Sequence, residues 1–167
     1  MACNYTLAAG IALNCADMNA QVGVTKDLIL VNYDEFDRAT TLATLEADNT
    51  NNNEGGLTNI NLKVGAVQNV FEGTDFSVVP SVTPEIKEDG KVWYAHSILF
   101  TAYSKTAATR KVIESLGGAK VVAIAVDRST GLYELFGADQ GLTMSGAERA
   151  YTGTQKSNFY DVTLSTP

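Results

Sequence analysis

The 167-residue sequence is poor in the side chains that bind metals and close disulfides. It has two cysteines, Cys3 and Cys15, and one histidine, His96. No CxxC pair and no Cys/His cluster occurs, which argues against a structural zinc site, and we predict no bound metal and no cofactor. A Cys3–Cys15 disulfide would need an oxidising compartment, and two free thiols in a protein made in the cytoplasm is the favoured alternative.

Long apolar runs are also missing. No stretch approaches the ~18 apolar residues of a membrane-crossing helix, so no membrane span is predicted. The apolar stretch from Leu7 to Cys15 does not fit a signal sequence, because no Lys or Arg precedes it and Asn14 stands before the cysteine. We instead expect an N-terminal arm over about residues 1–22 that carries an apolar stripe.

Signatures of catalysis are absent from the sequence. There is no GxSxG, no P-loop and no GxGxxG. His96 lies within a predicted strand, where a lone histidine is more often structural than catalytic. We therefore predict that the protein is not an enzyme and has no catalytic residue. An enzyme that uses His96 with a carboxylate is kept as an alternative.

The carboxylates gather in two places but lack the ordered spacing of a calcium-binding loop, so we interpret them as solvated. The clusters are Asp34, Glu35 and Asp37, and Glu85, Glu88 and Asp89.

The overall charge is acidic and unevenly distributed. The formal net charge is −7. Residues 1–90 carry 13 acidic and 4 basic side chains, a balance of −9, whereas residues 91–167 carry 6 and 8, a balance of +2. An acidic chain does not suit a protein that grips DNA, although DNA can slide past such a surface. Two halves of unlike charge would let copies stack head to tail, with the acidic part of one copy against the less acidic part of the next. Chance variation in the charges of a solvated surface is an equally good explanation.

What the sequence does contain is a series of β-strand patterns. The clearest are alternation over 59–66, which predicts a half-buried strand, and apolar residues on both faces of 92–103, which predict a central strand covered on both sides. A strand at 76–79 should end at Pro80. Residues 40–46 fit a short strand or a turn of helix. Further strands are predicted at 27–36, 120–126, 132–136, 142–145 and 158–164.

One helix is predicted, over residues 105–116, with Ser104 as its N-cap and Gly117 as its stop. Its buried stripe is expected to consist of Ala108, Val112, Ile113 and Leu116. A long Asn- and Gly-rich loop covers about 47–58 and is either disordered or used for contact. These elements predict a single mostly β (α+β) domain over 1–167. It is expected to be a sandwich or barrel of about seven strands with one helix outside.

A family resemblance adds a function. Residues 120–136 end in Leu-Phe, and Gly137 and the acidic loop Ala-Asp-Gln lead on to Gly141-Leu142. The last strand reads Tyr160-Asp-Val-Thr-Leu164. This series resembles the C-terminal half of tail-tube-like proteins from phages of the Bacteroides group, crAss-like phages included. The segments 1–4, 10–17 and 27–36 are similar to the openings of those proteins.

The resemblance implies a structural subunit of a phage tail. Such subunits assemble into rings, as hexamers or dodecamers, that form the tail tube or tail barrel. The implied partners are other copies, neighbouring tail or portal-proximal ring proteins, and genomic DNA that passes without specific binding. The implied location is the tail of the virion, after synthesis in the cytoplasm of the host bacterium.

The resemblance also implies where copies meet. The N-terminal arm and the long loop would contact neighbouring subunits through Leu7, Ile11, Leu13, Asn49, Asn51, Asn52, Asn53, Glu54, Gly55 and Gly56. The alternative function is a monomeric β-sandwich module that binds glycans through Trp93 and nearby tyrosines. It requires Trp93 to be exposed, whereas a core position in the central strand is favoured.

Overall fold

The computed structural model describes residues 23–50, 56–88, 90–103, 106–149 and 159–167. Its strands are β1 (Asp27–Asn32), β2 (Asn69–Glu72), β3 (Val78–Ile86), β4 (Val92–Ala102), β5 (Val121–Val126), β6 (Tyr133–Phe136), β7 (Thr143–Glu148) and β8 (Tyr160–Ser165). Its helices are the 3-10 turn η1 (Tyr33–Glu35) and the α-helices α2 (Arg38–Thr50) and α3 (Ala107–Gly118). The predicted mostly β fold is confirmed.

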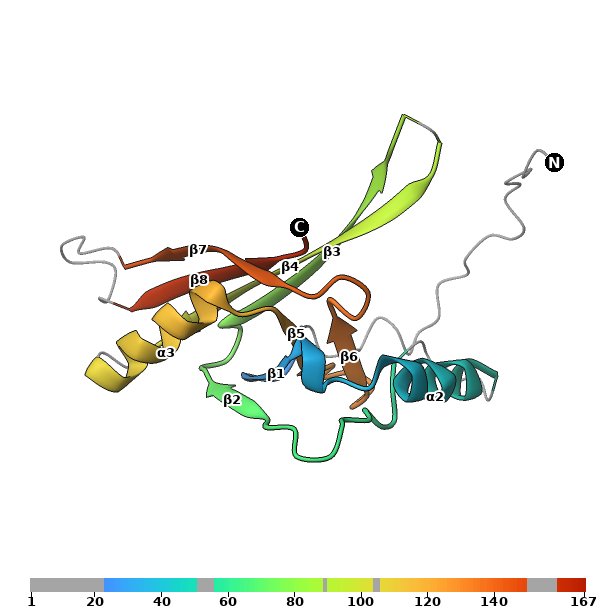
Figure 1. Ribbon diagram of the computed structural model, residues 1–167, viewed down its shortest axis with the longest axis horizontal. Helices are drawn as coiled ribbons and strands as arrows, with labels where there is room; N and C mark the ends of the chain where they lie inside the picture. The colour runs from blue at the N-terminus through green and yellow to red at the C-terminus, as the bar shows by residue number, and fades with distance from the viewer. Residues whose placement is uncertain (1–22, 51–55, 89, 104–105, 150–158) are drawn as a thin grey trace.

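The strands form two antiparallel sheets that pack as a sandwich (Figure 1). One sheet has the order β2-β1-β5-β6 and the other the order β3-β4-β8-β7. Val121 and Leu142 join the sheets at one corner, because each donates its backbone N–H to the carbonyl of the other, at 2.9 and 2.7 Å. The chain thus crosses from the first sheet to the second between β6 and β7.

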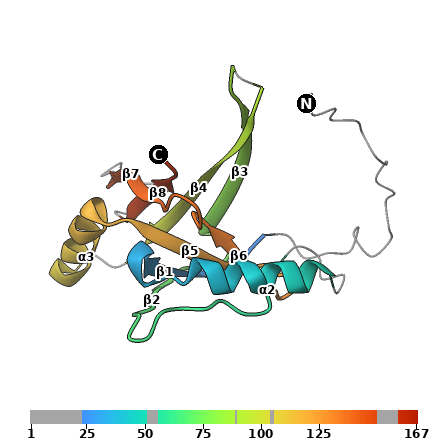
Figure 2. The ribbon, with the colours of Figure 1, turned by 45° about the vertical axis from the view of Figure 1, so that its right-hand side comes forward.

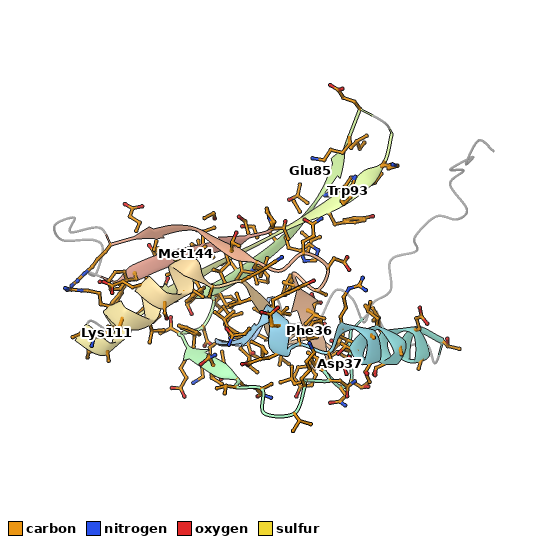
Figure 3. All side chains as sticks on the ribbon, in the orientation of Figure 1. Phe36, Asp37, Glu85, Trp93, Lys111 and Met144 are labelled. Carbon is orange, nitrogen blue, oxygen red and sulfur yellow. The ribbon has the colours of Figure 1, made fainter. Side chains whose placement is uncertain are left out.

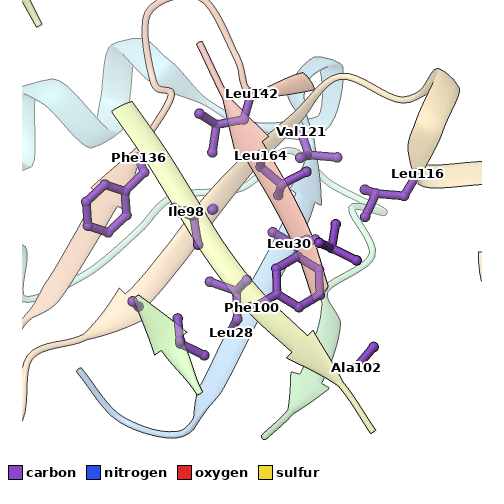
Figure 4. Packing of buried hydrophobic residues seen from close by; sticks show 14 of the residues in the cluster. Leu28, Leu30, Ile98, Phe100, Ala102, Leu116, Val121, Phe136, Leu142 and Leu164 are labelled. Atoms are coloured by element: carbon purple, nitrogen blue, oxygen red, sulfur yellow. The ribbon is translucent and has the colours of Figure 1, made fainter. Parts of the chain in front are cut away.

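The core lies between the two sheets (Figure 4). Leu30 comes from β1, Ile98 and Phe100 from β4, and Leu164 from β8, and all four are buried. The Phe71 ring meets the Phe100 ring edge-on at a centroid distance of 5.2 Å. Val162 and Leu164, two residues apart on β8, are both fully buried, so their face of the strand enters the core.

The C-terminal hairpins follow the sequence closely. β5 is apolar throughout and its first five residues are buried. It pairs with β6 from Ala123 to Val126. The turn between them includes Gly131, whose φ of +72° is a conformation that glycine adopts without strain. The strands predicted at 120–126 and 132–136 are therefore confirmed.

The structure contains two α-helices where one was predicted. Residues 40–46, and residues 47–50 of the predicted loop, belong to α2. The Asp37 carboxylate starts this helix by accepting from the Thr40 N–H at 3.2 Å, and this hydrogen bond lowers the Asp37 pKa. Thr41 is fully buried. The helix was missed because its threonines and its Asn-containing end have low helix propensity.

Helix α3 is confirmed with corrected details. Thr106, not Ser104, is its N-cap, and the Thr106 hydroxyl accepts from the Thr109 N–H at 3.2 Å. The helix continues to Gly118, past the predicted stop. Only half of the predicted stripe is correct: Ile113 and Leu116 are buried, whereas Ala108 and Val112 are exposed.

The strand predicted at 59–66 does not form. Only Leu62 makes an isolated bridge there, and Val64 is fully exposed. Asn61 explains the difference. Its N–H donates to the Thr41 hydroxyl at 3.1 Å and its carbonyl accepts from the Asp37 N–H at 3.2 Å. The segment is thus hydrogen-bonded to the start of α2, and β1 likewise ends early because η1 follows it.

Candidate functional site

The most prominent surface feature is the hairpin formed by β3 and β4, which extends beyond the sandwich (Figures 1 and 2). Nine residue pairs join its strands, from Val78 with Phe100 to Ile86 with Val92. β8 pairs only with the second half of β4, from Ser97 onward. No other strand of the described residues pairs with the outer part, and we call residues 82–88 and 90–95 the hairpin arm.

The tip of the arm is a regular turn. The Lys87 N–H donates to the Lys91 carbonyl at 3.0 Å, and the Gly90 N–H donates to the Lys87 carbonyl at 2.9 Å. Gly90 has a φ of +76°. These contacts and this backbone conformation reverse the chain between β3 and β4.

Two prolines lie within β3, which contradicts the predicted end of the strand at Pro80. Pro80 pairs with Ile98 and Pro84 pairs with Tyr94. β3 is the edge strand of its sheet. An edge strand tolerates proline wherever the missing N–H would face away from the neighbouring strand. The strand therefore runs through both prolines to Ile86.

One face of the arm continues the core-facing side of the sheet. Side chains alternate along a strand, so the even-numbered positions of β3 and β4 share the face of buried Ile98. On the arm this face holds Ile86, which is 78% exposed, and Tyr94, which is 63% exposed. Val82 and Val92 are exposed on the same face. No described residue of the sandwich covers them.

The opposite face of the arm is partly apolar as well. Trp93 lies there and is exposed, and Val79 and Leu99, which share this face of the hairpin closer to the sandwich, are exposed as well. Trp93 is 49% exposed and lies on the arm with Glu85 opposite, as Figure 3 shows. The favoured core position of Trp93 is therefore wrong, as is the expectation that β4 is covered on both sides along its whole length.

The composition of the arm is typical of a contact surface. A two-stranded hairpin alone is marginal in water, and clustered exposed apolar side chains mark sites of interaction. The signal in the sequence was the apolar character of both faces of 92–103. Such a pattern predicts coverage of both faces within the chain, whereas the described residues bury only one face of the second half of β4 and leave Leu99 on the other face exposed.

A groove of about 920 Å³ lies beside the base of the arm. It is lined by Val92 to His96 of β4, the loop from Gly137 to Gln140 and the terminal Thr166 and Pro167, among others. Arg38 closes one side, where its Nε donates to the Asp139 carboxylate at 3.0 Å. The Tyr33 hydroxyl donates to the Asp139 carbonyl at 2.7 Å and fixes the loop.

His96 lies at the base of the arm and has structural contacts. Its Nδ1 accepts from the Gly137 N–H at 3.2 Å, and its ring meets the Phe136 ring edge-on at 5.9 Å. Burial lowers the His96 pKa, and the Asp139 carboxylate opposes this in part. The nearby carboxylate is paired with Arg38, which leaves the imidazole as a link between β4 and the 137–141 turn.

Two of the three acidic residues that follow β1 use their carboxylates in local structure, and the third is contacted through its backbone carbonyl. The Val67 N–H donates to the Glu35 carboxylate at 3.0 Å, and Asp37 caps α2. Lys63 donates to the Asp34 carbonyl at 2.7 Å. Among the described residues, no group of three His, Cys, Asp or Glu side chains could hold a metal ion.

Most of the predicted interface residues cannot be placed. Residues 7, 11, 13 and 51–55 lie outside the described residues. Asn49 is in the last turn of α2. Gly56 is buried, and a Cβ added to it would lie 2.5 Å from the Leu132 Cβ, so the second half of the predicted loop enters the fold at this point. None of the helices in the described ranges is long and apolar enough to cross a membrane.

Comparison with known proteins gives no relative: no protein-family model, no curated protein and no solved structure matches the chain.

Proposed function

We propose that this chain is a structural subunit of a phage tail, which self-assembles into the rings of a tail tube or tail barrel. The observation that carries the proposal is the hairpin arm, with a set of exposed apolar side chains on one face and the exposed Trp93 on the other. Identical copies in a ring each present the same arm and the same receiving surface. Assembly would therefore cover every arm in the same way.

The charges and the sequence resemblance support the same function. An acidic chain repels DNA phosphates, which suits a channel that DNA must leave. The two-sheet sandwich with a helix on its outside is also the architecture that the tail-tube resemblance implies. The proposal needs no catalytic group.

The first test is the assembly state of the purified chain, by light scattering and negative-stain microscopy. We expect rings or short tubes with a central hole. Ile86→Lys places a charge on the most exposed part of the arm and should abolish assembly. Val64→Lys makes the same change at a fully exposed apolar residue outside the arm and should leave assembly intact. Equal assembly of both variants would contradict the role of the arm.

A glycan-binding module is the second candidate, because Trp93 is exposed and contributes to the groove. An exposed indole can stack on a sugar ring, and Asp139 and Gln140 line the same groove as hydrogen-bonding groups. This function predicts a 17.8 kDa monomer with saturable glycan binding that Trp93→Ala abolishes. Ring formation with no binding on a glycan array would reject it.

A further inference from the structure

We propose that the turn of residues 74–77 in one copy, with the Phe76 ring at its centre, inserts into the groove beside the hairpin arm of a second copy. This inference rests on the proposed self-assembly and names a contact that links the copies. It is carried by the backbone conformation of Phe76, by the contacts that hold its ring in an exposed position and by the lining of the groove.

Phe76 has a backbone conformation that is unfavourable for its residue type. It lies in a turn that the Ser77 N–H closes by donating to the Thr74 carbonyl at 3.1 Å. Its φ is +62°, and among the described residues it is the one non-glycine residue with a positive φ. A bulky side chain at such a φ costs free energy, and such strain is concentrated at functional sites. Burial does not compensate for it, because the ring is 64% exposed.

Neighbouring groups hold the exposed ring in place. The Arg128 guanidinium lies over the ring, with its central carbon 5.0 Å from the ring centroid. The same guanidinium is fixed from two sides, because its Nε donates to the Val24 carbonyl at 2.9 Å and it forms an ion pair with the Asp75 carboxylate. A ring that is exposed but already fixed loses little conformational freedom on binding. This is the property of an aromatic anchor in a protein interface.

The groove beside the arm has the size and the lining to receive such a turn. Its volume of about 920 Å³ lies within the range of roughly 300–1,000 Å³ that is typical of pockets for drug-sized ligands. Trp93 and Tyr94 both line it and are both exposed. Aromatic rings that meet edge-on or offset gain more than their buried area alone provides. The groove therefore offers a favourable surface to the Phe76 ring.

The charges of the two surfaces also match. In the groove, the cationic side chains of Arg38 and Lys87 are each paired with a carboxylate of the same chain. At the turn, Arg128 is likewise paired with Asp75. Both surfaces are thus balanced in charge where the structure describes them. Apolar contact around the ring, rather than a new ion pair, would drive their association.

The two surfaces lie at opposite ends of the same hairpin, which assigns the receiver to a second copy. His96, at the base of the arm, pairs with Val82, and the strand from Val78 to Val82 spans roughly 13 Å. Phe76 lies beyond Val78, and Figure 1 shows the segment that joins β2 to β3 at the end of the hairpin opposite to the arm. A contact between two different patches is heterologous, and such contacts generate rings when the rotation closes.

The first test removes the ring. Phe76→Ala should abolish assembly, by light scattering, at concentrations at which the parent chain assembles. Val64→Ala truncates a fully exposed apolar side chain outside both surfaces and should leave assembly intact. Equal assembly of the two variants would overturn the proposal.

A glycine at the same position separates the ring from the backbone. Phe76→Gly accepts the positive φ without strain, so it should melt about 2–4 °C above Phe76→Ala. It should nevertheless assemble no better than Phe76→Ala, because both lack the ring. Assembly restored by glycine would show that the shape of the turn, and not the ring, makes the contact, and would overturn the proposal.

Mixing two variants tests the pairing of the turn with the groove. The Phe76→Ala chain keeps the groove and Trp93, which is the only tryptophan in the sequence. A chain with both Trp93→Ala and Tyr94→Ala keeps the turn and has no tryptophan. Each chain alone should stay at 17.8 kDa and folded by circular dichroism, whereas the equimolar mixture should form a species of twice that mass. The Trp93 emission should shift to the blue only in the mixture.

The outcomes separate this inference from the proposed function. If the parent chain assembles but the mixture shows neither pairing nor an emission shift at up to about 1 mM, the contact is wrong and self-assembly stands. If the parent chain forms open chains without a central hole, and Phe76→Ala prevents them, ring formation is wrong and the contact stands. A parent chain that stays at 17.8 kDa at every concentration overturns both.

Discussion

The two halves of β4 have similar side chains but opposite surroundings. On one face, Ile98 and Phe100 are 0% and 2% exposed, whereas Val92 and Tyr94 on the same face are 50% and 63% exposed. The second half lies over the other sheet and beside β8, and the first half has neither. An apolar strand pattern thus indicates that a surface is to be covered, but it does not say by which chain.

The boundary between the halves lies at His96. Its backbone N–H and C=O both bond to Thr166, and its imidazole bonds to the 137–141 turn. Beyond His96 the hairpin loses its third strand. Substitutions on either side of this point should therefore affect different properties: stability on the buried side and association on the exposed side.

The largest effect is expected for Ile98→Ala in the buried half. Removing this side chain leaves a cavity between the sheets and should lower the free energy of unfolding by about 2–5 kcal/mol. Urea unfolding of monomeric protein measures it. A loss below about 1 kcal/mol would show that the second half of β4 is less tightly packed than the structure indicates.

A smaller effect is expected at the boundary itself. Thr166→Val removes the acceptor of the His96 N–H and should lower the free energy of unfolding by about 1 kcal/mol. Thr166→Ser keeps the hydroxyl, so its free energy of unfolding should be close to that of the parent protein. Equal losses in both variants would point to packing rather than to the hydrogen bond.

The pH dependence of stability should reveal the state of His96. Burial lowers its pKa, so below the ordinary value of about 6.5 the unfolded chain binds more protons than the folded one. Its contribution to stability is thus complete above pH ~6.5 and is lost as the pH falls through the folded pKa. As the pH falls below about 6.5, the melting temperature of the parent protein should therefore fall more than that of the His96→Gln variant. A parent curve that gains relative stability on acidification would contradict the assignment.

The smallest effect on stability is expected in the exposed half. Ile86→Ser should change the free energy of unfolding of the monomer by no more than about 0.5 kcal/mol, because the side chain is already in water. The same change should weaken assembly measurably by light scattering. A large loss of monomer stability would show that the arm is covered within its own chain and would remove the contrast between the halves.

Much of the sandwich was predictable from local pattern. The apolar run of β5, the alternation of β8 and the glycine turns after β5 and β6 specify their structure within a few residues. Helix α3 was predicted at the correct place, although its N-cap is Thr106 rather than Ser104 and Ala108 and Val112 are exposed. In these elements the local preference and the tertiary contacts agree.

Other elements depended on contacts that a sequence does not show. The 59–66 segment alternates like a strand, but Asn61 bonds to α2 instead. Helix α2 has weak helix formers and is fixed by Asp37 and by the burial of Thr41. A core position was predicted for Trp93 because its strand is central. β4 does lie inside the sheet order, but its first half extends beyond β8, and Trp93 is exposed there.

The sequence determined the mostly β class, the strands and turns of the C-terminal half and the apolar character of both faces of β4. The tertiary structure decided which apolar residues are buried, because burial depends on how far β8 and the opposite sheet extend. It also decided which edge of the hairpin is open. The periodicity of the sequence shows which residues share a face of a strand. Which strands lie side by side, and which edge of a sheet stays open, depends on pairing between segments that are tens of residues apart in the chain.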